Sequence, residues 1–276
     1  MRSHYRLLAL KLGKSVHLDE GRLSVDLNAA RNCLPVTNDA QFQAALGPET
    51  YFWLSGGGTY LINNRHVLIV RRSTQSRINA GKYSLFTGRA DNELEHRDPG
   101  RIVRELFEEL ILFAGDRLWE PTCAGFESII SPIYSKVKEK CGFHPGQTSL
   151  LPLQIMHDFN KPLRVRFEGQ TRDYDLDYHI SGNRDINVLF LFSAQVDVNS
   201  LRAMDGEHIH DPQGDNGPSR EIFLYDPLER RARGISKNGC SMPQESVIDD
   251  SDMTEHLLHM VSRLRSIKQS ANSERE

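Results

Sequence analysis

Short apolar stretches, several of them β-branched and bounded by turn-forming residues, recur along the chain, and this pattern predicts β-strands. The clearest stretch is residues 66–72 (HVLIVRR), whose β-branched and apolar side chains end in two arginines. Residues 187–196 form the most apolar stretch, and residues 163–167 and 174–180 are spaced as the two arms of a hairpin. Further short strands are predicted at residues 5–12, 22–27, 51–54, 59–62, 83–86 and 221–225.

Three glycines at residues 56–58 stand between two of these predicted strands. No Gly-Lys-Ser or Gly-Lys-Thr follows them, so they do not have the pattern of a phosphate-binding loop. Glycine inside a strand pattern marks a bulge or a close approach of backbone to a neighbour. We therefore expect the backbone at residues 56–58 to lie close to another segment.

Apolar residues recur at three- and four-residue spacing in four segments, which predicts four helices. The most informative is residues 99–113, because Pro99 takes the first helical position that proline favours. Its predicted buried face carries Ile102, Leu106, Leu110 and Phe113. The other helices are predicted at residues 38–46, 126–140 and 252–268. Strands interleaved with a few helices predict a layered α/β fold.

The charge of the chain argues against two classes of partner. The 34 Lys and Arg against 37 Asp and Glu give a net charge of −3, which does not suit a protein whose main task is to grip nucleic-acid phosphates. No apolar run approaches the ~20 residues needed to span a bilayer, and the first residues lack the cleavage site of a signal peptide. We expect a cytoplasmic protein with neither a membrane nor a nucleic-acid partner. The four cysteines have no CxxC spacing and are expected to be reduced thiols.

Three carboxylates crowd one strip of the predicted helix at residues 99–113. Glu105 is three residues from Glu108 and four from Glu109, and like charges at this spacing weaken an isolated helix by a few tenths of a kcal/mol per pair. A hard divalent cation with oxygen ligands would turn this repulsion into binding. Arg104 is placed to orient a carboxylate by a bidentate hydrogen bond. The alternative is an ordinary solvated acidic helix face.

The order of these features resembles the Nudix hydrolase superfamily. Residues 104–109 (RELFEE) match every defined position of the Arg-Glu-apolar-any-Glu-Glu part of its signature. Gly88 fits the leading glycine, and Glu95 is the better fit for the isolated glutamate, with Glu93 as a rival. The segment from Gly88 to Arg104 is two residues longer than the family pattern, and Ile111 stands where a glycine usually follows the glutamate pair. The resemblance covers residues 51–113 and extends more loosely to residue 225.

The resemblance implies a fold and a domain organisation. The expected core is an α/β/α sandwich with a mixed sheet, formed by residues 49–276 with insertions at about residues 114–185. Residues 1–48 are expected to form a β-rich N-terminal extension that packs on this core, and a helix closes the chain.

The resemblance also implies a reaction, the divalent-metal-dependent hydrolysis of a nucleoside diphosphate linked to another moiety. Carried over by position, Glu105, Glu108 and Glu109 are the ligands of Mg²⁺ or Mn²⁺, and Arg104 orients Glu105. Glu105, Arg104 and Glu108 are then the catalytic residues, and Glu95 is a supporting carboxylate.

The substrate side and the general base are less closely defined by the resemblance. Arg71 and Arg72 end a strand that would face the site, and with Gly88 they are the candidate substrate-binding residues, although strand-end arginines in solvent fit the pattern equally well. The general base is either a glutamate of the signature or an acid from a distant loop, where Asp205 and Glu207 are candidates.

Two other functions stay open at this point. A catalytically weak Nudix-like domain that binds a nucleotide as a sensor fits the lengthened segment and the missing glycine. Isomerase chemistry, a third possibility, lacks a cysteine or histidine at a matching position. The expected partner is a nucleotide-like small molecule, with a second copy of the chain as a further candidate.

Overall fold

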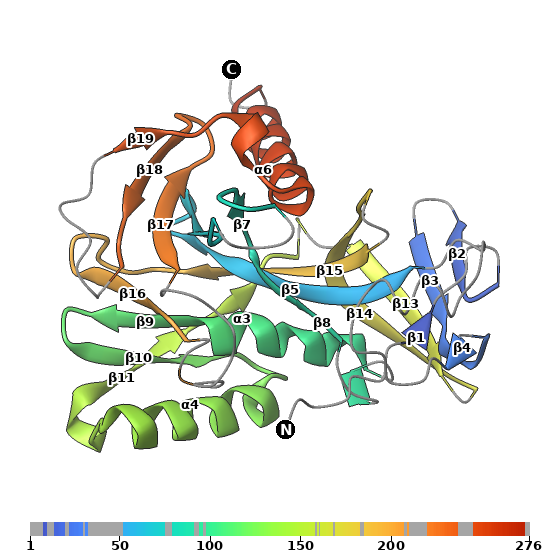
Figure 1. Cartoon of the computed structure of the whole chain (residues 1–276), viewed down its shortest axis with the longest axis horizontal. Coiled ribbons are helices and arrows are strands. Elements are labelled where there is room, and N and C mark those ends of the chain that lie inside the picture. The colour runs from blue at the N-terminus through green and yellow to red at the C-terminus, as the bar shows by residue number, and fades with distance from the viewer. Residues whose placement is uncertain are drawn as a thin grey trace. The chain divides into compact units, whose positions relative to one another are not determined.

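The computed structural model, whose helices and strands are labelled in Figure 1, divides into two compact units. The first unit consists of Met1–Gly57, Thr87–Val103 and Asn160–Phe190, and the second of Gly58–Phe86, Arg104–Phe159 and Leu191–Glu276. The structure describes residues 8–9, 14–19, 22–29, 31–32, 52–74, 79–90, 94–95, 98–157, 159, 161–167, 169–182, 185–206, 209, 220–236 and 245–273. Strands predominate and a few helices accompany them, so the expectation of a mixed α/β fold is confirmed.

Some predictions concern residues outside this description. These are the helix at residues 38–46, the domain boundary at residue 48, and the candidates Glu93 and Glu207. They stay predictions.

The first unit contains a mixed sheet in the order β2-β3-β13-β14-β15. Its strands are β2 (Val16–Asp19), β3 (Arg22–Asp26), β13 (Lys161–Phe167), β14 (Gln170–Ile180) and β15 (Asp185–Ala194), and all neighbours are antiparallel except β3 and β13. On β3 and β13 the buried side chains are two residues apart, as strand alternation requires. They are Leu23 and Val25 on β3 and Leu163 and Val165 on β13.

The hairpin of β13 and β14 confirms the prediction for residues 163–180, and Gly169 lies in its turn at φ +78°. Shorter elements of this unit are the paired strands β1 (Leu8–Ala9) and β4 (Arg31–Asn32) and the 3-10 turns η1 (Leu27–Ala29) and η2 (Pro99–Val103). Strand β8 (Phe86–Arg89) pairs with β5. Its first residue, Phe86, is the last residue of a segment of the second unit.

Strand β5 (Trp53–Ile62) is one continuous strand where the sequence predicts two. At Gly56 an added Cβ would lie 2.4 Å from Cγ2 and 2.5 Å from the carbonyl oxygen of Val188. These distances are far below van der Waals contact, so only glycine fits. The prediction of a close backbone approach is confirmed at Gly56.

The second unit contains an antiparallel sheet in the order β19-β18-β17-β6-β5, with β7 (Tyr83–Ser84) also paired to β6 (His66–Arg71). Its other strands are β17 (Glu221–Asp226), β18 (Arg231–Gly234) and β19 (Ser246–Val247). Asn63 and Asn64 form the predicted turn between β5 and β6, at φ 50° and 54°. Asparagine tolerates this left-handed conformation.

A four-stranded sheet in the order β11-β10-β9-β16 completes the second unit with its helices. Its strands are β9 (Leu110–Ala114), β10 (Arg117–Thr122), β11 (Thr148–Pro152) and β16 (Leu201–Asp205). The remaining elements are α3 (Arg104–Glu109), α4 (Glu127–Cys141), α6 (Glu255–Ser273), β12 (Gln154–Ile155), η3 (Pro145–Gln147) and η4 (Asp250–Asp252). Helices α4 and α6 confirm two sequence predictions.

The predicted helix over residues 99–113 is wrong in its extent. Residues 99–103 form the 3-10 turn η2, α3 covers only residues 104–109, and the chain then enters β9. The four residues that follow Glu109 are all fully buried. A helix buries one side of such a run, whereas a strand between β10 and β16 buries both sides.

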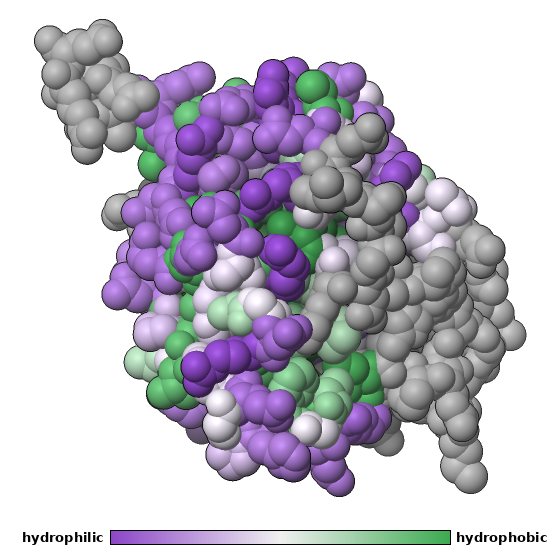
Figure 2. Space-filling model, turned by 90° about the vertical axis from the view of Figure 1, so that its left-hand side faces the viewer, coloured by the Kyte–Doolittle hydropathy of each residue, from purple (hydrophilic) through white to green (hydrophobic). Residues whose placement is uncertain are grey.

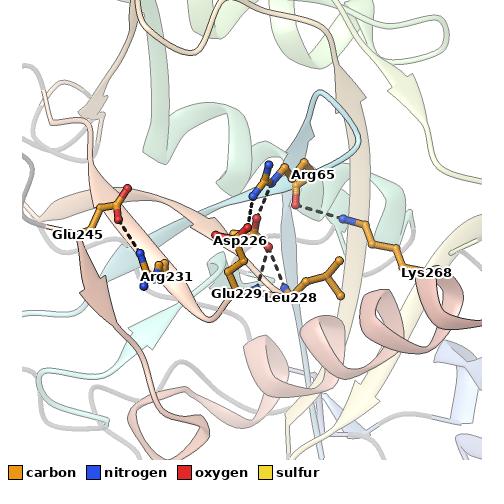
Figure 3. Close-up of polar contacts among 7 residues, drawn as sticks. All are labelled: Arg65, Asp226, Leu228, Glu229, Arg231, Glu245 and Lys268. Atoms are coloured by element: carbon orange, nitrogen blue, oxygen red, sulfur yellow. Dashed lines mark hydrogen bonds and ion pairs between the residues drawn. The ribbon is translucent and has the colours of Figure 1, made fainter. Parts of the chain in front are cut away.

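Asp226, at the end of β17, joins two turns of the second unit (Figure 3). Its carboxylate accepts hydrogen bonds from Arg65 Nε at 2.5 Å and from the backbone N–H groups of Leu228 and Glu229 at 2.9 and 3.2 Å. Lys268 on α6 donates to the carbonyl oxygen of Arg65 at 3.3 Å. One carboxylate thus fixes the turn after β17 and the turn before β6, to which α6 also binds.

On the face shown in Figure 2, hydrophilic residues predominate and smaller hydrophobic patches lie between them. Among the described helices, none is both long and apolar enough to cross a membrane. Cys123 is buried and Cys141 is exposed, and neither is in a disulfide, as expected.

Candidate functional site

Helix α3 carries the acidic residues of the signature and is held by its apolar side. Leu106 and Phe107 are fully buried, and the Phe107 ring lies 5.7 Å from the ring of Phe192 on β15. This packing leaves Glu105 and Glu108 on the partly exposed side, with 16% and 22% of their side chains accessible. The packing of its apolar side therefore fixes the position of the short helix that carries these carboxylates.

Arg104 bridges two of these carboxylates. Its guanidinium donates to Glu105 Oε1 at 2.7 Å through NH2, and to Glu108 Oε2 through NH1. The expected contact with Glu105 is present, and the guanidinium also reaches Glu108, so that it links two carboxylates. A bridging guanidinium offsets the repulsion between the two glutamates.

Glu109 belongs to a second ion-pair cluster with Arg220 and Asp205. Arg220 NH1 lies 3.4 Å from Glu109 Oε1, while its Nε and NH2 donate to the two oxygens of Asp205 at 2.9 and 2.7 Å. The Asp205 side chain is only 1% exposed, at the end of β16. The candidate base Asp205 is thus held by a bidentate arginine.

Gly206 brings the end of β16 against α3. Its backbone N–H donates to the carbonyl oxygen of Glu109 at 2.9 Å. An added Cβ at Gly206 would lie 1.9 Å from the carbonyl oxygen of Glu108 and 3.0 Å from Cγ1 of Ile111. Only glycine permits this approach, which places Asp205 beside the acidic helix.

The donor set fits a hard divalent cation by its chemistry. The four carboxylates and two guanidiniums of this site sum to a formal charge of −2, and carboxylate oxygens are the ligands that Mg²⁺ prefers. Arg104 contacts Glu105 and Glu108, and Arg220 contacts Glu109 and Asp205, so the carboxylates form two separate pairs. Within the described ranges, no three His, Cys, Asp or Glu side chains converge closely enough to hold an ion. Binding would therefore require the glutamates to turn toward the cation.

Gly88 and Glu95 belong to the first unit. Gly88 lies inside β8, so the predicted glycine turn before the acidic helix is wrong at this position; pairing of β8 with β5 keeps the backbone extended. Glu95 is 2% exposed and lies in a short helical segment.

Arg71 and Arg72 end β6 in the second unit. Arg71 contacts its strand neighbours: its Nε donates to the carbonyl oxygen of Gly81 at 3.3 Å, its NH1 lies 3.8 Å from Glu221, and its guanidinium lies 5.9 Å from the Tyr83 ring centroid. These contacts fit the structural alternative of a strand-end arginine. The backbone N–H of Arg72 donates to the carbonyl oxygen of Lys82 at 2.9 Å.

Sequence reasoning missed Arg220 and Gly206. Arg220 lies outside every motif, 15 residues after its partner Asp205, and no periodicity links the two. The only sequence signal is that both flank the same Asp- and Gly-rich loop.

Comparisons of the chain with protein-family models, with curated proteins and with solved structures found no match.

Proposed function

We propose that the chain is a divalent-metal-dependent pyrophosphohydrolase that acts on a nucleotide-like diphosphate, with a Nudix-like sandwich as its fold. The observation that carries the proposal is the signature on α3, whose three glutamates lie on one short helix beside the buried Asp205. A surplus of negative charge in this cluster suits a bound cation. We also propose that the protein acts in the cytoplasm.

In this proposal Glu105, Glu108 and Glu109 hold Mg²⁺ or Mn²⁺. The bound cation would neutralise phosphate oxygens and help to make a water nucleophilic. Arg104 orients Glu105 and Glu108 through its two hydrogen bonds. Charge stabilisation and positioning supply most of the rate in such reactions.

Replacement of one α3 carboxylate tests the proposal. A panel of nucleoside diphosphate derivatives is assayed with Mn²⁺ or Mg²⁺, and the products are identified by mass. We expect Glu108→Gln to lower kcat by about a hundredfold or more, a few kcal/mol of transition-state stabilisation. Glu139→Gln removes an exposed charge on α4 and should keep normal turnover. Near-normal turnover of Glu108→Gln would contradict the assignment.

The position of bond cleavage is a second part of the same test. Because the cation's charge is useful where negative charge accumulates on phosphoryl oxygens, water should attack phosphorus. Hydrolysis in ¹⁸O-labelled water should then place the label on a phosphate product. Label on a carbon atom would contradict the proposed reaction.

A nucleotide-binding sensor is the second candidate function. One observation favours it: Arg104 and Arg220 already pair the carboxylates, so the cluster does not need a cation to offset its repulsion. A sensor would bind a nucleotide with metal and return it unchanged. Tight binding without turnover across the panel would support this function over hydrolysis.

A further inference from the structure

Arg220 is fixed in place by Asp205. Three hydrogen bonds hold it: its Nε and NH2 reach the two carboxylate oxygens at 2.9 and 2.7 Å, and its backbone N–H reaches Oδ2 at 3.0 Å. The two side chains are only 15% and 1% exposed. The guanidinium is therefore a cation whose position does not depend on Glu109.

The contact between Arg220 and Glu109 is the weakest of this cluster. Charge-assisted N–H···O bonds are commonly about 2.7–2.9 Å long, and NH1 lies 3.4 Å from Glu109 Oε1. Opening this contact leaves the three bonds to Asp205 intact. The position of Arg220 is thus set by Asp205 and not by Glu109.

We propose that Arg220 is a built-in counter-cation for Glu109, anchored by Asp205, which competes with the divalent cation for that carboxylate. The inference rests on the proposed function, since it needs Glu109 as a cation ligand. Without a divalent cation, Arg220 positions Glu109 and balances its charge. When a cation binds, Glu109 turns to it and Arg220 remains on Asp205. Asp205 then acts as an anchor rather than as a general base.

A purely structural role for Arg220 is the alternative. In that case Arg220 only ties the end of β16 to the start of β17, and its loss changes stability without changing cation affinity. Cation affinity is therefore the readout that separates the two roles.

The test measures Mn²⁺ binding to the full chain by electron paramagnetic resonance, together with Tm with and without Mn²⁺. We expect Arg220→Met to bind Mn²⁺ about threefold or more tightly, because a fixed like charge beside the ligand is gone. Its Tm should fall without Mn²⁺ and recover on adding Mn²⁺ by more than the wild-type Tm rises. Lys138→Met removes a charge paired with Glu120 at 2.9 Å and should leave Mn²⁺ affinity unchanged.

Asp205→Asn should shift Mn²⁺ affinity in the opposite direction. Removing the anchor's charge frees Arg220 to pair fully with Glu109, so Mn²⁺ should bind more weakly than to wild type. This variant decides the question if Arg220→Met does not yield folded protein. Arg220→Lys keeps the charge and should retain affinity closer to wild type than Arg220→Met does.

The outcomes distinguish the two proposals. If the wild-type chain binds Mn²⁺ and hydrolyses a diphosphate but Arg220→Met and Asp205→Asn leave the affinity unchanged, the counter-cation role is overturned and the function stands. If the wild-type chain neither binds Mn²⁺ nor hydrolyses any substrate, the proposed function fails and this inference fails with it.

Discussion

Asp226 shows what one buried carboxylate contributes to the second unit. Its side chain is 5% exposed, and burial by itself raises the pKa of this carboxyl group. The hydrogen bonds from Arg65 and from the backbone N–H groups of Glu229 and Leu228 outweigh burial, so the pKa is lowered from its ordinary 3.8. The folded state therefore favours the ionised form more than the unfolded chain does.

The lowered pKa has a defined pH dependence. A carboxyl group with a lower pKa in the folded state stabilises the fold above its unfolded pKa, and this stabilisation is lost as pH falls through the folded pKa. We expect Asp226→Asn to lower the free energy of unfolding by about 1–3 kcal/mol at pH 7, because three donors lose their buried, charged acceptor. The difference from wild type, measured by urea unfolding, should shrink below pH 3.8.

Asp173 supplies the matched control for this variant. It forms an ion pair with Arg164 at 2.9 Å, and its pKa is also lowered, chiefly by that hydrogen bond, but half of its side chain is exposed. Exposed pairs contribute only about 0–1 kcal/mol. Asp173→Asn should therefore change stability little at pH 7. A larger loss there than in Asp226→Asn would contradict the importance of burial.

At the scale of elements, the junction of α3 and β9 separates what the sequence pattern predicts from what it does not. The carboxylates of α3 follow from the spacing of residues 104–109 alone. The end of the helix does not, because residues 110–113 have apolar spacing that also fits a helix, and only their two neighbouring strands decide in favour of β9. Tertiary pairing overrode local periodicity at this point.

Ile111 lies in β9 with its side chain fully buried, at the position where the resembled signature has a glycine. We expect Ile111→Gly to destabilise the protein by about 2–5 kcal/mol, since it leaves a cavity and removes a strand side chain. Ile111→Val should cost about 0.5–1.5 kcal/mol. Thermal unfolding of both variants checks this, and an Ile111→Gly protein as stable as wild type would contradict it.

The whole molecule is harder to predict because its units are not contiguous in sequence. The chain passes from one unit to the other five times, so no single boundary divides it. Local signals identified strands such as β6, β15 and β17, the β13–β14 hairpin and helices α4 and α6, since each depends on neighbours in sequence. They identified none of the four strands β9, β10, β11 and β16. The Asp205–Arg220 ion pair and the Gly206 approach depend on packing between segments far apart in the chain. No periodicity or motif records such packing.

This interleaving predicts that the two units unfold together. Strands β5 and β15 each have residues in both units, so loss of either unit leaves the other with shortened strands. Gly56→Ala strains the first unit and Gly206→Ala the second, because the added Cβ meets neighbouring atoms at 2.4 and 1.9 Å. Each should cost about 1–3 kcal/mol and lower the same single transition by several degrees in calorimetry. Gly146→Ala, where nothing lies within 4 Å of the added Cβ, should leave Tm within about a degree of wild type. Two transitions, each lowered by only one of the two strained variants, would instead mean that the units are independent folding domains.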